Sequence, residues 1–208
     1  MTLTASSVGN TPDRLRLRHS LIIDQNSYHN HSVLDLGSHN DRWGKAVIDV
    51  GARSVTAVDR SPLPSDCSAI QHHREDIRSF LSTAQDEYDT ILCLGVLYHT
   101  HDPIGLLQAM MRLKPKQIIL DTDVTNRAEP VLEIIQDSYE DTRTDRPTGR
   151  GVTVIRCVMS VQAIRECVTS LGGVLEELRA DHYPTTDDCE DYLRGVRRVF
   201  RITPHFGN

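Results

Sequence analysis

The chain has 208 residues, enough for one ordinary domain and too few for two of usual size. Its apolar fraction of 38% can build a core, and its formal net charge of −6 argues against a generally basic nucleic-acid-binding surface. The longest uncharged apolar run, residues 91–97, is far shorter than a membrane span, so we expect a cytoplasmic protein without membrane contact. The five cysteines are widely spaced and contain no C-x-x-C pair, which favours reduced thiols over a zinc ribbon or a disulfide framework.

Strand-like and helix-like segments alternate along the chain. After a polar start, the apolar spacing of residues 12–24 predicts an amphipathic helix, within an N-terminal extension over residues 1–30 that precedes a single domain over 31–208. Strands are expected at 32–36, 54–58, 69–72, 89–97, 116–120, 152–158, 174–178 and 196–202, and helices at 42–50, 77–84, 103–111, 128–139 and 161–171. This order predicts an α/β fold with a doubly wound, mostly parallel sheet, to which the last two strands add an antiparallel edge.

The segment 33–44 has the strongest functional signal. A buried strand runs into a turn and then a helix, which is where open α/β sheets bind ligands. Asp59 follows at the end of the next strand, 22 residues after Gly37, and an acid there can accept hydrogen bonds from both hydroxyls of a ribose. A dinucleotide site needs three glycines in G-x-G-x-x-G, but His39 and Arg42 occupy the second and third places. The pattern therefore favours a nucleoside without phosphates.

These residues resemble the first motif of the class I S-adenosylmethionine-dependent methyltransferases, and the resemblance covers about residues 30–205. Asp35 and Gly37 match the D-x-G at the start of that motif. Ser38-His39-Asn40, with Arg42-Trp43 after it, is similar to a subgroup of the family. Asp41 stands where that subgroup has glycine, and aspartate tolerates a positive φ better than most residues.

Three later features also match the family. Asp59 stands at the place of its ribose-binding acid, and Glu75-Asp76-Ile77 resembles the short motif that meets the adenine amino group. The stretch from Asp89 to His99 resembles its fourth strand, ending in Leu-Tyr-His and followed by Asp102-Pro103. Similar G-V-L-Y-H segments occur in methyltransferase-like enzymes that modify tRNA wobble uridine and in several small-molecule methyltransferases.

The resemblance implies a Rossmann-like fold with S-adenosylmethionine as the cofactor. It places the cofactor on Asp35, Gly37, Ser38, His39, Asp59, Arg60, Asp76, Ile77, Leu94 and Gly95. Simpler roles stand beside these: Asp76 is also suited to capping the helix that follows it, and Asp59 to a solvated loop. Trp43 is expected in the core or the pocket wall.

Tyr98 and His99 are the candidate catalytic residues, because they follow the apolar strand at the edge where substrates arrive. Histidine suits a general base near neutral pH, and Tyr98 would orient the acceptor. The alternative is a hydrogen-bonded structural pair. No metal is expected, since His99, His101 and Asp102 lack a distant fourth ligand.

The acceptor is the part of the function that the sequence leaves open, together with the oligomeric state. A small-molecule acceptor is our main expectation. One alternative is a transferase that moves a group from a modified S-adenosylmethionine onto tRNA, and another is a catalytically silent subunit with the cofactor fold. A polar loop over 141–151 contains Arg143, Arg146 and Arg150, which would suit an anionic substrate.

Overall fold

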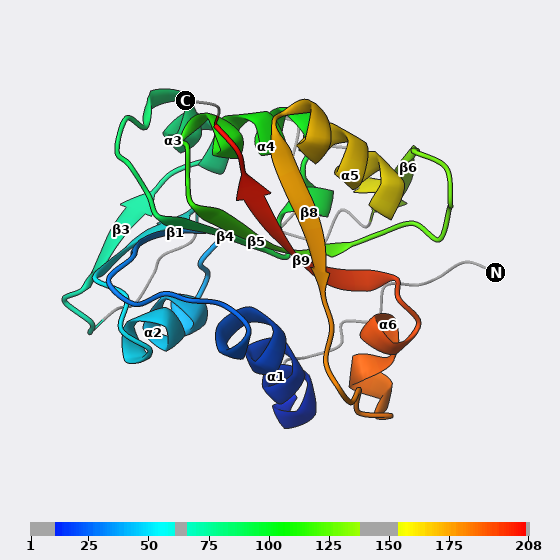
Figure 1. The fold of residues 1–208 in the computed structure, drawn as a ribbon, viewed down its shortest axis with the longest axis horizontal. Coiled ribbons are helices and arrows are strands. Elements are labelled where there is room, and N and C mark those ends of the chain that lie inside the picture. Colours follow the sequence, from blue (N-terminus) through cyan, green and yellow to red (C-terminus); the bar gives the residue numbers. More distant parts are fainter. Residues whose placement is uncertain (1–10, 61–65, 138–153, 207–208) are drawn as a thin grey trace.

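A computed structural model describes residues 11–60, 66–137 and 154–206. Its centre is a seven-stranded sheet in the order β3-β2-β1-β4-β5-β9-β8 (Figure 1). In that order the strands are Ile70–Arg74, Ser54–Asp59, Ser32–Leu36, Thr90–Leu94, Gln117–Asp123, Arg197–Pro204 and Gly173–Leu178. The first five are parallel, and β9 is antiparallel to both of its neighbours, β5 and β8. The predicted mostly parallel sheet with an antiparallel pair at one edge is confirmed.

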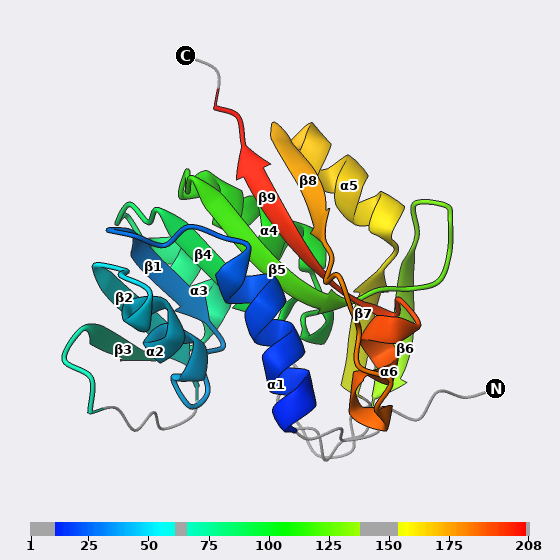
Figure 2. The ribbon, with the colours of Figure 1, turned by 60° about the horizontal axis from the view of Figure 1, so that its bottom comes forward.

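Helices cover both faces of the sheet (Figures 1 and 2). One face carries α1 (Pro12–His19), α2 (Arg42–Asp49) and α6 (Glu190–Leu193), over a core that includes Leu21, Val47 and Tyr192. The other carries α3 (Ile77–Thr83), α4 (Pro103–Arg112) and α5 (Val161–Ser170), over a core that includes Leu107 and Phe200. Because both faces of the central strands are buried under helices, these strands are continuous apolar runs in the sequence.

The N-terminal helix lies where the sequence predicts it, but it consists of an α-helical part followed by a π-helical turn. Pro12 begins α1, and Thr11 caps it by accepting a hydrogen bond from the Arg14 amide at 3.4 Å. The next five residues, Ser20–Asp24, continue as a π-helical turn whose Leu21, Ile22 and Ile23 are buried. The apolar residues of this segment are therefore part of a buried core, as their spacing predicts.

The helix predicted over 128–139 is wrong. Residues Leu132–Asp137 form strand β6, which pairs antiparallel with β7 (Val154–Met159) from Leu132↔Met159 to Asp137↔Val154, outside the main sheet. A short apolar run such as Leu-Glu-Ile-Ile has no decisive period, and pairing with a distant strand settled its conformation. The polar loop predicted over 141–151, with its three arginines, lies outside the described residues.

Strand β4 is also shorter than predicted, since it ends at Leu94 instead of residue 97. Gly95 adopts a φ of +82°, and Leu97–His99 then form a single 3₁₀ turn. This bend carries Tyr98 and His99 out of the sheet. In the described parts of the chain, no helix combines the length and apolarity that a membrane span requires.

Candidate functional site

A cavity of about 480 Å³ lies at the carboxyl ends of the parallel strands. The chain leaves β1 for β2 on one side and returns to β4 on the other, so this is the switch point where doubly wound sheets bind ligands. Eleven of the twelve residues predicted for the site line it: Gly37, Ser38, His39, Asp59, Arg60, Asp76, Ile77, Leu94, Gly95, Tyr98 and His99. The volume is in the usual range for small-molecule sites.

The loop after β1 forms the floor of this cavity. Gly37 has a φ of +73°, and a Cβ there would stand 2.6 Å from Val96 Cγ2, so the turn requires glycine. The Ser38 hydroxyl is buried and has no hydrogen-bond partner among the described residues. The His39 amide donates to Asp59 Oδ2 at 2.9 Å, which ties the loop to the end of β2. A buried polar atom without a partner, beside backbone with no side chain, suits a polar ligand.

Asp76 both caps a helix and lines the cavity. Its carboxylate accepts hydrogen bonds from the Arg78 amide at 2.9 Å and the Ser79 amide at 3.0 Å, and it pairs with Arg60. Burial acts to raise the pKa of Asp76, but the Ser79 amide and the Arg60 guanidinium outweigh it and lower that pKa. The carboxylate is therefore charged at neutral pH. The two interpretations of Asp76 from sequence are compatible.

Asp35 is the predicted cofactor residue that does not line the cavity. Its carboxylate is fully buried beneath the loop, where it accepts a hydrogen bond from the Gly44 amide and its Oδ2 has no hydrogen-bond partner among the described residues. Burial raises the pKa of Asp35 to about 7, and the nearby charges of Asp41 and Asp59 add to the shift. Asp35 is thus buried next to the start of α2, outside the cavity lining.

Tyr98 and His99 line the cavity together and are both buried. Their rings lie 4.1 Å apart between centroids, and Arg197 Nη1 donates to Tyr98 Oη at 3.2 Å. Burial raises the pKa of Tyr98 against the effect of Arg197, so the side chain is a neutral phenol at physiological pH. Because its oxygen already accepts a hydrogen bond from Arg197, the Tyr98 hydroxyl can donate a hydrogen bond to a bound group.

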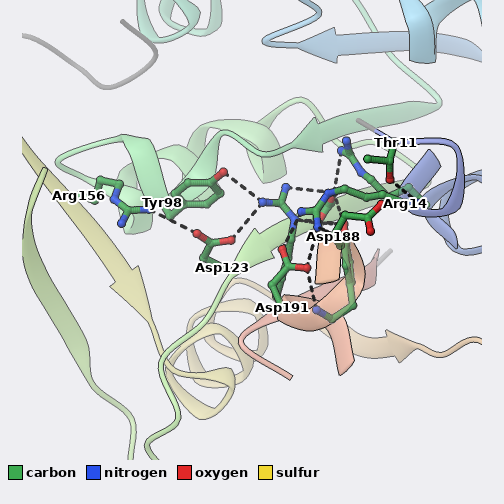
Figure 3. Close-up of polar contacts among 11 residues, drawn as sticks. Thr11, Arg14, Tyr98, Asp123, Arg156, Asp188 and Asp191 are labelled. Carbon is green, nitrogen blue, oxygen red and sulfur yellow. Dashed lines mark hydrogen bonds and ion pairs between the residues drawn. The ribbon is translucent and has the colours of Figure 1, made fainter. Parts of the chain in front are cut away.

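A charged network supports this side of the cavity (Figure 3). Arg197 donates through Nε to Asp121 at 2.8 Å and through Nη1 to Asp123 at 3.1 Å, and Arg18 pairs with Asp121 at 2.7 Å. Burial acts to raise the pKa of Asp121, but Arg197 and Arg18 outweigh it and lower the pKa to about 2. Tyr192 also donates to Asp121, at 3.0 Å. The buried charges are paired, as their burial demands.

The N-terminal helix forms part of the cavity wall, which the sequence did not predict. Arg14 and Arg18 line the cavity from α1, and Arg18 lies 4.9 Å from the centre of the Trp43 ring. Arg14 is held by Asp191 of α6 at 2.6 and 2.7 Å (Figure 3). No local pattern marks these arginines, because their partners are more than 100 residues away. One signal was available in the sequence: arginines at positions 14, 16 and 18 alternate with Leu15 and Leu17.

Metal binding has no structural support in the described ranges, where no group of three or more His, Cys, Asp or Glu side chains is arranged to hold an ion. His101 is exposed. Asp59, Asp76, Tyr98 and His99 all line the same cavity.

Comparisons with known proteins show the family of this chain. A family model described as a methyltransferase domain matches residues 10–177. A tRNA U34 carboxymethyltransferase of Nautilia profundicola is 30% identical over 118 residues, which are 49% of this chain and 37% of that protein. A protein of the same name from Vibrio vulnificus is 27% identical over 189 residues, which are 79% of this chain and 54% of that protein. The chain thus spans about half or less of the length of these relatives.

Solved structures share the fold at low sequence identity. The S-adenosylmethionine-dependent methyltransferase of Mesorhizobium loti superposes with a TM-score of 0.61 at 14% identity, covering 94% of this chain and 99% of that one. The 1,6-didemethyltoxoflavin-N1-methyltransferase of Burkholderia thailandensis, solved with its substrate and S-adenosylhomocysteine, gives 0.59 at 15% identity, covering 94% and 77%. These similarities concern the fold.

Proposed function

The chain belongs to the methyltransferase domain family, whose cofactor is S-adenosylmethionine, and we propose that it transfers a methyl group to a small-molecule acceptor. The observation that carries the proposal is the single cavity that joins the loop after β1, Asp59 and the Tyr98-His99 pair. Ser38 Oγ, which is buried and has no hydrogen-bond partner among the described residues, and the bare backbone of Gly37 and Gly95 fit a cofactor of this polarity.

We assign the cofactor to the side of the cavity formed by β1, β2 and the start of α3. Asp59 accepts hydrogen bonds from the ribose, as its position at the end of β2 suggests. Asp76 and Ile77 lie where the adenine would rest, and the loop Gly37–His39 supports the rest of the nucleoside. S-adenosylmethionine supplies a methyl group on a sulfonium, which becomes a neutral thioether when the methyl leaves.

We assign the acceptor to the side formed by β4, the 3₁₀ turn and α1. Tyr98 donates a hydrogen bond from its hydroxyl to the acceptor and fixes the orientation of the acceptor, because Arg197 holds the phenol oxygen. His99 takes the proton that a hydroxyl or amine acceptor must lose. The buried position of both side chains limits competing water.

A small molecule is favoured over tRNA by the pairing of most of the basic residues around the cavity. Six arginines line it, and within the described part of the chain all except Arg42 are paired with an aspartate: Arg14, Arg18, Arg60, Arg78 and Arg197. A surface that binds RNA needs arginines and lysines available to phosphates. The relatives named tRNA U34 carboxymethyltransferase keep carboxymethyl transfer to tRNA as the second candidate, and they match only part of this chain.

The test starts with binding. Calorimetry should show micromolar-order binding of S-adenosylmethionine and S-adenosylhomocysteine and none of NAD. Labelled S-adenosylmethionine is then offered with separate metabolite, RNA, protein and lipid pools. Label in the metabolite pool supports the proposal. Methyl label in RNA, with a rate that falls steeply with salt, would replace the small-molecule acceptor with an RNA. Carboxymethyl transfer needs a parallel assay with a carboxymethyl-labelled sulfonium donor, because S-adenosylmethionine carries no carboxymethyl group. Binding without transfer in either assay would identify a silent subunit.

A further inference from the structure

Asp41 follows the loop Gly37–Asn40 and has a backbone conformation that glycine adopts more easily than other residues. Its φ is +57° and its ψ is 10°, in the left-handed region. The Asp41 amide donates to Ser38 O at 3.1 Å, and its carbonyl accepts from the Lys45 amide at 2.8 Å, so it closes the turn and opens α2 at once. An aspartate here needs a compensating interaction.

The compensating interaction of Asp41 is with a residue of the sheet, His72, and not with the cavity. The Asp41 side chain does not cap α2 and is fully buried, with both carboxylate oxygens 2.9 Å from His72 Nε2. Asp41 is not among the residues that line the cavity. Its carboxylate therefore binds β3, two strands away from β1.

The sheet register shows how the contact is made. Asp35 of β1 pairs with Ala57 of β2, and Ala57 pairs with His72 of β3, so the three form one row across the sheet. Register partners of parallel strands point to the same face, here the face covered by α2. Ala57 has only a methyl group, which leaves room for the Asp41 carboxylate between Asp35 and His72.

The contact between Asp41 and His72 matters because Asp35, another buried carboxylate, lies in the same row of the sheet. Asp35 is buried close to Asp41, and two buried carboxylates repel unless a donor or positive charge stands near them. His72 provides a donor to Asp41 from β3, and Lys45 of α2 and Arg18 of α1 are the nearby cations. On the opposite side of the loop, Asp59 holds the His39 amide.

We propose that Asp41 and His72 are a pair of positioning residues for the cofactor: the Asp41 carboxylate, bound to His72, fixes the loop Gly37–Asn40 in the turn that glycine gives in similar methyltransferases. The inference rests on the proposed placement of the cofactor in the cavity. Neither residue touches the cofactor. Their effect is on the shape of the loop that does.

The test is a double-mutant cycle read by calorimetry with S-adenosylhomocysteine. His72→Ala leaves the Asp41 carboxylate buried beside Asp35 without its partner, and should weaken binding about tenfold or more. Asp41→Gly adopts the turn freely and should change the dissociation constant less than about threefold. In the His72→Ala background, Asp41→Gly should therefore restore affinity to within about threefold of Asp41→Gly alone.

His73→Ala is the matched control. His73 is the next residue of β3, and its ring packs against Phe80 on the other face. Combined with Asp41→Gly, it should show no coupling. A loss caused only by shortening a β3 side chain would not be rescued by a substitution in the loop, so the rescue shows that the loss acts through the Asp41 carboxylate.

Three results would overturn the inference: unchanged affinity in His72→Ala, a double variant as weak as His72→Ala, or equal coupling for His73→Ala. If His72→Ala is too unstable to titrate, the variant that combines His72→Ala with Asp41→Gly should still fold and bind S-adenosylhomocysteine. If this double variant also fails to fold or bind, the proposed role of Asp41 and His72 is rejected. Asp59→Ala distinguishes the two proposals. Loss of affinity in Asp59→Ala without rescue at Asp41 rejects only the pair, whereas unchanged affinity in Asp59→Ala rejects the placement of the cofactor.

Discussion

Replacing Asp35 by asparagine should stabilise the folded protein above neutral pH. The side chain is fully buried, and its Oδ2 has no hydrogen-bond partner among the described residues. Burial first, and then Asp41 and Asp59, raise its pKa to about 7. An aspartate in an unfolded chain has a pKa of about 3.9. The fold therefore binds this proton more tightly than the unfolded chain does.

The sign and size of the effect follow from that difference. The stability linked to Asp35 is fully present below the unfolded pKa and is lost as the pH rises through about 7. Three pKa units correspond to about 4 kcal/mol, an upper value because the surroundings relax around a buried charge. Asparagine cannot ionise, so Asp35→Asn should avoid the loss. It should match the wild type only below about pH 4, gain on it as the pH rises from there to about 7, and exceed its free energy of unfolding by roughly 2–4 kcal/mol at pH 8.

Urea unfolding of both proteins at several pH values between 4 and 8 measures this difference directly. Asp49→Asn is the matched control, because Asp49 is an exposed aspartate on α2. A gap between Asp35→Asn and wild type that is the same at every pH would refute the reasoning. So would a variant that is less stable than the wild type at pH 8.

Three further substitutions test the site. Asp59→Ala should fold normally but weaken S-adenosylhomocysteine binding by roughly 1–3 kcal/mol in calorimetry, through lost ribose hydrogen bonds, whereas Asp49→Ala should not. Gly37→Ala should lower the free energy of unfolding by about 1–2 kcal/mol or more and weaken binding, because a Cβ there would meet Val96 Cγ2 at 2.6 Å and φ is +73°; wild-type values would contradict the turn. Asp121→Asn should cost roughly 3–5 kcal/mol at pH 7 by leaving Arg18 and Arg197 without its charge. Since the pKa of Asp121 is lowered to about 2, that stabilisation is present above about pH 4 and falls away in acid, so urea midpoints should converge towards pH 2.

The sequence predicted the parts of the site that are local in the chain. The strand-turn-helix pattern around Gly37 and the position of Asp59 each depend on a few neighbouring residues, and parallel strands bring their carboxyl ends together by geometry alone. Strand β6 failed for the opposite reason. Its conformation depends on pairing with β7, whose residues lie about 20 positions later.

The charged network was beyond local reasoning as well. Arg197 appears in the sequence as one member of a basic run, yet its neighbours Arg198 and Arg201 bind glutamates of β8 while Arg197 is buried against Asp121. Arg197 and Arg201 lie on the same face of β9, so alternation does not separate them, and only the partner residues show which of the two is buried. The departure at Asp41 was visible in the sequence, but its explanation needed the contact with His72, 31 residues away.

Chemistry at His99 can be separated from cofactor binding, because we propose that His99 serves the acceptor and Asp59 the cofactor within the same cavity. If His99 takes the acceptor's proton, His99→Ala should lower kcat by about 10²–10⁴ while the affinity for S-adenosylhomocysteine changes little. His99→Asn keeps a polar group but cannot accept the proton, so it should be nearly as slow. The wild-type rate should fall in acid as the imidazole takes a proton, and both variants should lose that dependence. Full activity in both would leave positioning by Tyr98 and Arg197 as the mechanism, whereas a change confined to KM would mean that His99 holds the acceptor without taking its proton.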